Sequence, residues 1–279
     1  MAFSLKDGVI MRNACKSVKS LLFSRSSFSS RSLAHLSFSM ALITKQLSPH
    51  HWMRYDPEWV EKPNAPIFTA QYWQQQERVF GSATGRGTTW FVQMPKIQAA
   101  LRHYRRGGLF GRLVQDGYFY TGLASTRSFA ELALLQELRN AGVRVPRPLA
   151  AKVERNGLCY RADILTEYIE GATSLVDLLK QRALSDDELA SVALEIAKMH
   201  KACVNHTDLN IHNILFDKEG LVWLIDFDKC YKSNKKGWRQ ANLQRLERSF
   251  LKESKKQPLF WQAKNFTQLI SYYDQYLSC

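Results

Sequence analysis

The sequence predicts an α+β fold, with strands concentrated before residue 170 and helices after it. Short apolar runs bounded by turn residues dominate the first part, whereas the second part carries apolar residues at helical spacing. With 279 residues, of which 45% are hydrophobic, the chain can form one large or two small domains with a substantial core. We expect a segment 1–39 outside the fold, a β-rich region 40–169 and a helical region 170–279.

Residues 1–39 differ in composition from the rest of the chain. They are rich in Ser and Arg, and Asp7 is their only acidic residue. Such a start is typical of an organelle transit peptide, and the alternative is an over-extended reading frame with Met40 as the true initiator. Either interpretation leaves this segment outside the folded domain.

From residue 40 to about 76, prolines and tryptophans interrupt any period, so we expect irregular structure that ends in a short helix at 69–77. Gly85 and Gly87 then precede a β-branched and aromatic strand that ends at Val92. Glycines allow backbone amides to approach a phosphate closely, which makes this turn a candidate phosphate contact.

Residues 99–108 are predicted to form a strand that runs into a basic turn. Arg105, Arg106 and Arg112 supply the positive charge of this turn. They form either an anion-binding patch or an ordinary solvated surface, and the sequence leaves both interpretations open.

A helix is predicted over residues 126–142, because leucines recur at helical spacing and Gly142 with the following prolines marks its end. Ser128 and Glu131 have the spacing of a capping box. Glu131 is therefore either the acid of that box or the partner of a cation elsewhere in the fold.

A β-hairpin is predicted over residues 150–169, with Asn156-Gly157 as its two-residue turn. A second long helix begins after Ser185, which forms a capping box with Glu188. Its apolar stripe is expected to face the core and consists of Leu189, Val192, Ile196 and Met199.

Residues 206–228 combine three oxygen-bearing side chains with two buried strands. The apolar runs around the turn 217–220 predict a short hairpin, which brings Asn213 at its start beside Asp226 at its end. Two oxygen ligands on neighbouring strand ends suit Mg²⁺, whose other positions are filled by water and phosphate oxygens. Asp208 lies in the preceding loop, where its carboxylate is free to accept a proton from a substrate hydroxyl.

Three histidines near this motif are expected to have structural roles. The ring of His206 should bond the backbone of its loop, whereas His200 and His212 should be packing or surface residues. No other side chains at metal-ligand spacing accompany them in the sequence.

The pattern His-x-Asp-Leu-Asn-x-x-Asn-Ile-Leu, followed by Asp-Phe-Asp, resembles the catalytic loop and metal-binding motif of the protein-kinase-like superfamily. The resemblance implies a two-lobed protein-kinase-like fold, with a small β-rich N-lobe and a larger helical C-lobe, and ATP as the phosphate donor. It makes Asp208 the catalytic base, and Asn213 and Asp226 the Mg²⁺ ligands. Asp228 replaces the glycine that ends the motif in protein kinases, as is common in the small-molecule branches.

The same resemblance assigns a cation to the phosphates of the nucleotide. A kinase carries this cation on the strand predicted at 99–108, where Arg102 is the candidate and Lys96 the alternative. Glu131 is then preferred as the helix carboxylate that pairs with the cation.

Backbone contacts with the nucleotide are implied at two further places. Gly85 and Gly87 stand where a kinase has its glycine-rich loop, and Glu167 and Ile169 stand where the hinge holds adenine. After Asp228 the chain lacks the long activation segment of protein kinases, which favours a small or glycolipid acceptor over a peptide.

A basic helix with an apolar face is predicted over residues 238–255. This pattern suits a helix on an anionic membrane surface, and it equally suits an amphipathic helix packed on the lobe. Since no apolar run reaches the ~20 residues needed to cross a bilayer, membrane association would be peripheral.

Four segments, 101–109, 126–131, 160–167 and 242–249, and the loop residue Asn210 carry a closer resemblance. In these residues the chain resembles the bacterial 3-deoxy-D-manno-octulosonic acid (Kdo) kinases of lipopolysaccharide assembly, from about Thr44 to about Leu277. The resemblance implies ATP- and Mg²⁺-dependent phosphorylation of the 4-hydroxyl of Kdo on a lipid A precursor. It also implies a peripheral position at the cytoplasmic face of the inner membrane, on an anionic surface. Because these kinases are bacterial, we favour Met40 as the true start.

Composition narrows the possible partners. The net charge of +14 fits an anionic partner, but nucleic acid is not expected because the basic residues lack a recognised reading motif. Five scattered cysteines without a C-x-x-C pair favour a reducing compartment. Two alternatives stay open: a kinase of another acceptor, such as a core heptose, a small molecule or a protein, and a catalytically dead kinase-like module that binds a membrane or a partner.

Overall fold

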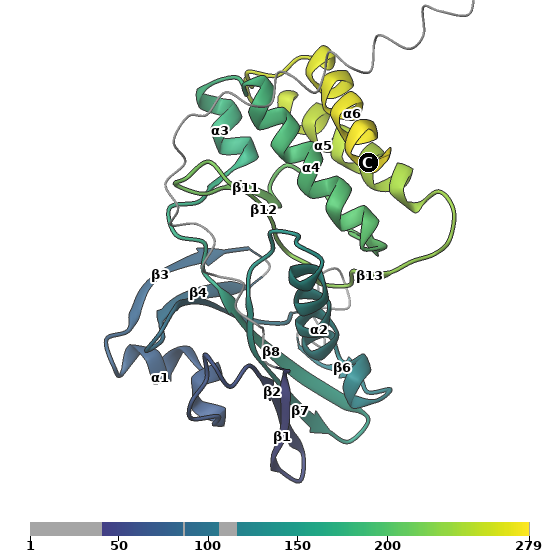
Figure 1. The fold of residues 1–279 in the computed structure, drawn as a ribbon. Helices are drawn as coiled ribbons and strands as arrows, with labels where there is room; N and C mark the ends of the chain where they lie inside the picture. The colour runs from purple at the N-terminus through teal and green to yellow at the C-terminus, as the bar shows by residue number, and fades with distance from the viewer. Residues whose placement is uncertain (1–40, 86, 106–115, 279) are drawn as a thin grey trace, which may run out of the picture. The chain divides into compact units, whose positions relative to one another are not determined.

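The computed structural model describes residues 41–85, 87–105 and 116–278. The chain forms two units, Met1–Ser39 and Met40–Cys279. Figure 1 shows the large sheet of the second unit in its N-terminal part, and most of its helices, coloured green to yellow, in its C-terminal part together with short strands. The predicted α+β class is confirmed, whereas the division at residue 170 stays a prediction.

Eight of the described strands form one antiparallel sheet in the order β1-β2-β7-β8-β5-β4-β3, with β6 paired to β8. The bounds are β1 (Ile43–Ser48), β2 (His51–Tyr55), β3 (Val79–Thr84), β4 (Thr88–Gln93), β5 (Gln98–His103), β6 (Tyr118–Phe119), β7 (Pro148–Asn156) and β8 (Cys159–Glu167).

The hairpin of β1 and β2 corrects the prediction of irregular structure in residues 40–76. Pro49 lies in the turn between the two strands, so it removes no hydrogen bond from either ladder. Trp52, which interrupts the local pattern, pairs with Val153 of β7 inside the sheet. Aromatic residues are favoured in strands, so the presence of Trp52 is no argument against a strand in this segment.

A short 3-10 helix (Ala65–Phe68) and α1 (Ala70–Gln74) cover the sheet near β3 and β4. The side chain of Thr69 caps α1 by accepting a hydrogen bond from Tyr72 N. Trp73 is buried, and its Nε1–H donates to Ile67 O at 2.8 Å. The helix predicted at 69–77 is therefore present, although shorter.

The long helix of the N-terminal part, α2 (Arg127–Asn140), packs on β7 and β8 after a 3-10 turn at Leu123–Ser125. Its N-cap is Thr126, so the capping box of Ser128 and Glu131, one of the two interpretations left open for Glu131, does not form. Ser128 already lies in the first helical turn, and its hydroxyl donates to Lys152 O on β7. Glu131 is consequently free of a capping role.

The hairpin of β7 and β8 is present, but its turn lies one residue further along than predicted. Asn156 pairs with Cys159, which leaves Gly157 and Leu158 as the two-residue turn. Gly157 takes the left-handed conformation (φ +58°), and glycine at the first turn position is the pattern of a type II′ hairpin.

Four helices and five short strands follow in the described C-terminal part. Ser185 and Glu188 make both hydrogen bonds of the predicted capping box, and the four predicted stripe residues are at most 1% exposed. The bounds are β9 (Thr173–Ser174), α3 (Leu175–Gln181), α4 (Asp186–Lys201), β10 (Val204–Asn205), β11 (Ile214–Phe216), β12 (Val222–Leu224), β13 (Tyr231–Lys232), α5 (Trp238–Ser254) and α6 (Ala263–Ser278).

The basic helix α5 packs its apolar face into the core. Leu243, Leu246 and Phe250 are buried, and the Phe250 ring stacks on Trp261 with centroids 3.8 Å apart. The packed interpretation of this helix is therefore confirmed for these residues, while Leu251 stays 55% exposed. None of the helices that the structure describes has both the length and the apolar character to span a membrane.

Candidate active site

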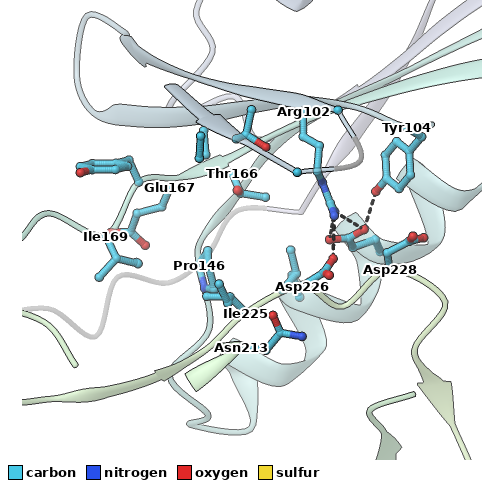
Figure 2. Close-up of a pocket in the computed structure, with 18 of the residues that line it drawn as sticks. Arg102, Tyr104, Pro146, Thr166, Glu167, Ile169, Asn213, Ile225, Asp226 and Asp228 are labelled. Atoms are coloured by element: carbon cyan, nitrogen blue, oxygen red, sulfur yellow. Dashed lines mark hydrogen bonds and ion pairs between the residues drawn. The ribbon is translucent and has the colours of Figure 1, made fainter. Parts of the chain in front are cut away.

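A cavity of about 920 Å³ lies where the turn between β3 and β4, the strands β5 and β8, the helix α2 and the β11–β12 hairpin meet. Its lining contains nine residues that the sequence predicts for the site: Gly85, Gly87, Arg102, Glu131, Glu167, Ile169, Asp208, Asn213 and Asp226. Figure 2 shows Asn213 and Asp226 near Arg102, with Glu167 and Ile169 at the other end of the pocket.

His206 organises the loop that carries Asp208. Its Nδ1 accepts a hydrogen bond from Asp208 N at 3.2 Å, so the proton lies on Nε2, which donates to Ile225 O at 3.0 Å. The ring is fully buried, and this burial lowers the pKa of His206 below its ordinary value. The neutral imidazole thus ties the loop to the end of β12, as expected for a structural histidine.

The main chain of Asp208 holds the loop together. Its carbonyl oxygen accepts hydrogen bonds from the side-chain amides of Asn210 and Asn213, both at 2.9 Å. The carboxylate of Asp208 is exposed in the cavity and makes no hydrogen bond to another described residue. It is therefore available to a substrate hydroxyl.

The β11–β12 hairpin brings two oxygen donors together. Ile225 N donates to Asn213 O at 3.0 Å, which makes Asn213 and Asp226 neighbours at the open end of the hairpin. Since the Asn213 amide nitrogen bonds Asp208 O, its oxygen is the atom left for a ligand. Asp226 has a left-handed backbone (φ +63°), an uncommon conformation that clusters at functional sites.

These donors fit a hard divalent cation. Within the described ranges, no group of three or more His, Cys, Asp or Glu side chains could hold a metal ion. Mg²⁺ needs only one or two protein oxygens when phosphates complete its shell, and Asn213 and Asp226 supply that number.

Arg102 on β5 reaches two carboxylates. Its Nη2 lies 2.6 and 2.7 Å from the oxygens of Glu131, and its Nη1 lies 2.6 Å from Oδ1 of Asp226. The hydroxyl of Tyr104 also donates to Glu131, at 2.5 Å. Burial disfavours the charged form of Arg102, but the nearby carboxylates outweigh it and raise the pKa of the guanidinium. The predicted pairing of Arg102 with Glu131 is present.

Lys96, the alternative cation, lies outside the cavity lining. It follows β4, is 45% exposed and contacts Glu58 O and the carboxylate of Glu61. Of these two candidates, Arg102 is the one that lines the cavity.

Asp228, at the glycine position of the kinase motif, pairs with Arg127. The guanidinium of Arg127 donates to both oxygens of Asp228, from Nε at 2.7 Å and from Nη2. Arg127 also lies over the ring of Tyr118, with its Cζ 4.7 Å from the ring centroid. No local pattern predicts this pair, although an acid in place of a motif glycine beside a buried strand is a signal that a cation should lie nearby.

The last residue of β8 and the segment that follows it line the cavity. The carboxylate of Glu167 faces away, since it accepts from Arg147 N at 3.0 Å. Tyr168 N donates to Gln98 O on β5, so strand alternation directs Glu167 O and Ile169 N to the opposite edge. Apolar side chains line the cavity beside this edge, namely Ala100, Pro146, Leu215 and Ile225, of which Figure 2 labels two.

The glycine turn between β3 and β4 is closed by a hydrogen bond from Gly85 N to Gly87 O at 2.9 Å. A Cβ atom on Gly87 would lie 3.1 Å from Cδ of Arg105, so a side chain there would push Arg105 aside. Arg105 itself lines the cavity and is exposed, while Arg106 and Arg112 lie outside the described residues.

Comparison with known proteins agrees with this geometry. Residues 70–273 match the lipopolysaccharide kinase (Kdo/WaaP) family. A protein of Vibrio vulnificus (strain CMCP6) named 3-deoxy-D-manno-octulosonic acid kinase is 57% identical over 220 residues, which are 79% of this chain and 93% of the relative. Proteins of the same name from Vibrio cholerae serotype O1 and Haemophilus influenzae (strain 86-028NP) are 55% and 47% identical, over 72% and 75% of this chain and 86% and 90% of their own lengths. Because the family match spans more than half of the sequence, the chain belongs to the lipopolysaccharide kinase (Kdo/WaaP) family.

Proposed function

We propose that this protein transfers the γ-phosphate of ATP to the 4-hydroxyl of Kdo in a Kdo-bearing lipid A precursor. The activity class is supported by relatives named 3-deoxy-D-manno-octulosonic acid kinase at 46–57% identity over most of the chain. One structural observation carries the proposal: an exposed Asp208 carboxylate, an Asn213 and Asp226 oxygen pair and Arg102 all line a single cavity.

The nucleotide would lie along the wall made by the sheet. Its adenine would contact the backbone of Glu167 and Ile169, where apolar side chains offer a surface for a flat ring. Its phosphates would lie under the turn of Gly85 and Gly87, beside the Arg102 guanidinium. A guanidinium held by a buried carboxylate stays charged and oriented, which is the preorganisation that phosphoryl transfer requires.

Asn213 and Asp226 would hold Mg²⁺, which supplies neutralisation of the β- and γ-phosphate charge when bound. Arg102 takes Oδ1 of Asp226, so the other carboxylate oxygen is left for the ion. The amide of Asn213 is oriented by its bond to Asp208 O, so one hydrogen bond links a metal ligand to the loop of the base.

Asp208 would accept the proton of the attacking sugar hydroxyl. Its carboxylate has no partner among the described residues, whereas its N–H and C=O are both bonded within the loop. The side chain is therefore available for the acceptor while its main chain is held still, and general base catalysis depends on such positioning.

We also propose peripheral binding at the cytoplasmic face of the inner membrane, because the acceptor is a lipid. The C-terminal end of α5 supports this, since the exposed Leu251 lies next in sequence to Lys252 and near Lys255 and Lys256. Binding to vesicles of anionic phospholipid and not to vesicles of neutral phospholipid would support this part of the proposal, and equal binding to both would contradict its electrostatic basis.

The test of the function is transfer of labelled γ-phosphate by the full chain with Mg²⁺ to a lipid A precursor that carries one Kdo, beside the same lipid without Kdo. Label on the Kdo-bearing lipid alone is the expected result, and the position of the phosphate on the product then tests the 4-hydroxyl. Label on neither lipid, in a preparation that binds ATP, would overturn the acceptor assignment.

A further inference from the structure

Three Arg or Lys residues belong to the cavity lining within the described part of the chain: Arg102, Arg105 and Lys229. The charge of Arg102 is shared between two carboxylates, and Arg105 lies against Gly87 at the phosphate end. Lys229 comes from the other wall, immediately after Asp228. It makes no hydrogen bond or ion pair with another described residue, so its ammonium is free for a ligand.

The backbone at Lys229 is unusual for a lysine. Cys230 N donates to Phe227 O at 3.0 Å, which closes a tight turn with Asp228 and Lys229 at its centre. Lys229 holds the left-handed conformation (φ +64°) that glycine or asparagine takes at low cost in such turns. A lysine in this position is disfavoured locally, and residues in such conformations cluster at ligand sites.

The charges around Lys229 indicate what the ligand is. Asp228 is its sequence neighbour, but both oxygens of that carboxylate are bonded by Arg127. Asp208 lines the same cavity, and its exposed carboxylate would repel an anionic acceptor that brings a hydroxyl to it. The free ammonium of Lys229, a residue of the same lining, would offset this repulsion, and an ammonium suits a carboxylate or phosphate oxygen as a compact point charge.

We propose that Lys229 binds the carboxylate of a sugar-acid acceptor and thereby selects an acidic sugar over a neutral one. This inference rests on the proposed function, because it assigns the acceptor's own anion to a side chain of the same site. Lys229 is then a specificity residue on the acceptor side, distinct from Arg102 and Arg105 on the phosphate side.

Substitution by glycine separates binding from structure at this position. Lys229→Gly removes the ammonium and also relieves the left-handed backbone, so the protein should be at least as stable as the wild type. The KM for the Kdo-bearing acceptor should nevertheless rise about ten- to a hundredfold, the range for losing one charge-assisted hydrogen bond. The KM for ATP should stay within about twofold, and Lys229→Arg should keep most of the acceptor affinity.

The matched control is Glu77→Gly. Glu77 is exposed, has the same left-handed backbone (φ +56°) and lies outside the cavity lining. This variant should gain stability in the same direction without any change in either KM. A rise in acceptor KM for both variants would mean that backbone strain, and not the ammonium, sets acceptor affinity, and would overturn the proposal.

An acceptor whose Kdo carboxylate is methylated tests the named contact directly. Wild-type protein should use the ester about as poorly as Lys229→Gly uses the acid, and the variant should no longer distinguish ester from acid. A rise in the KM for ATP alone would show that Lys229 binds the γ-phosphate, and unchanged constants would show that it binds neither substrate. If wild-type protein ignores the Kdo-bearing lipid altogether, the proposed function fails first and this inference falls with it.

Discussion

Arg102 on β5 donates a hydrogen bond to Oδ1 of Asp226 at a distance of 2.6 Å, across 124 positions of sequence. The same guanidinium bonds the buried Glu131 on α2. One side chain therefore connects the sheet, the helix and the proposed metal ligand, and the position of each depends on the other two.

Replacement of Arg102 should affect both stability and catalysis. Arg102→Ala leaves Glu131, which is 4% exposed, without its cation, and breaking a buried pair in this way costs about 3 kcal/mol. The kcat/KM for ATP should fall about a hundredfold or more, as for loss of a preorganised transition-state donor. Arg102→Lys should recover only part of either quantity, because one ammonium cannot reach both carboxylates as a fork does. Urea unfolding and ATP kinetics measure the two effects.

Lys96→Ala is the matched control for Arg102. Lys96 precedes the same strand, but it and its partner Glu61 are largely exposed, so the stability change should stay within about 0.5 kcal/mol. Equal losses for both variants would contradict the assignment of Arg102 as the cation of the site.

Asp208→Ala should remove nearly all turnover without lowering the stability of the fold. The contacts of Asp208 within its loop are made by main-chain atoms, so truncation of the side chain leaves them in place. We expect a fall in kcat of about 10²–10⁴, the usual contribution of a positioned base, with the affinity for ATP and the Tm unchanged. Calorimetric titration with a non-hydrolysable ATP analogue checks the binding. Wild-type turnover in this variant would exclude Asp208 as the base.

The Arg127 and Asp228 pair should behave as one coupled unit. Both side chains are at most 20% exposed, so each single alanine variant leaves the other charge largely buried without its partner. The double variant should therefore lose less free energy of unfolding than the sum of the two single variants. A coupling energy of about 1–3 kcal/mol is expected from a double-mutant cycle measured by urea unfolding. Strictly additive losses would mean that the pair does not contribute to holding α2 against the Asp228 segment.

Stability should fall on acidification because of His200. The ring is buried between Tyr273 and Asn242, and burial lowers the pKa of His200 to about 4 from its ordinary 6.5. Since the folded state resists protonation, this contribution to stability is complete above pH 6.5 and is lost as the pH falls towards 4. The shift corresponds to about 3 kcal/mol. In His200→Gln, the free energy of unfolding should fall less steeply on acidification than in the wild type. Equal slopes in the two proteins would contradict the assignment.

The sequence predicted the structure of residues 206–228 well because the geometry of this segment is local. The hairpin of β11 and β12 and the loop before it follow from apolar runs and turn residues within about twenty positions of one another. Asn213 and Asp226 are therefore neighbours by the length of one turn, and Asp208 precedes them by five residues. The capping box at Ser185 was predictable for the same reason, since its two hydrogen bonds span three residues.

Predictions failed where a longer-range contact competed with a local pattern. Ser128 and Glu131 have capping spacing, but the helix begins earlier and the Ser128 hydroxyl bonds β7 instead. The turn of β7 and β8 moved by one residue because the register of the whole ladder sets which pair closes it. The strand β2 was missed because its pairing with β7 outweighs the irregular local pattern.

By itself, the sequence determined that Asp208, Asn213 and Asp226 lie close together, because their order and spacing are set within one loop and one hairpin. Only the tertiary structure decided how they are held. The choice of Arg102 over Lys96 depends on the register of the sheet, and the Arg127 pair with Asp228 joins residues 101 positions apart. Such contacts form only when separately folded elements pack, so no local pattern of residues specifies them.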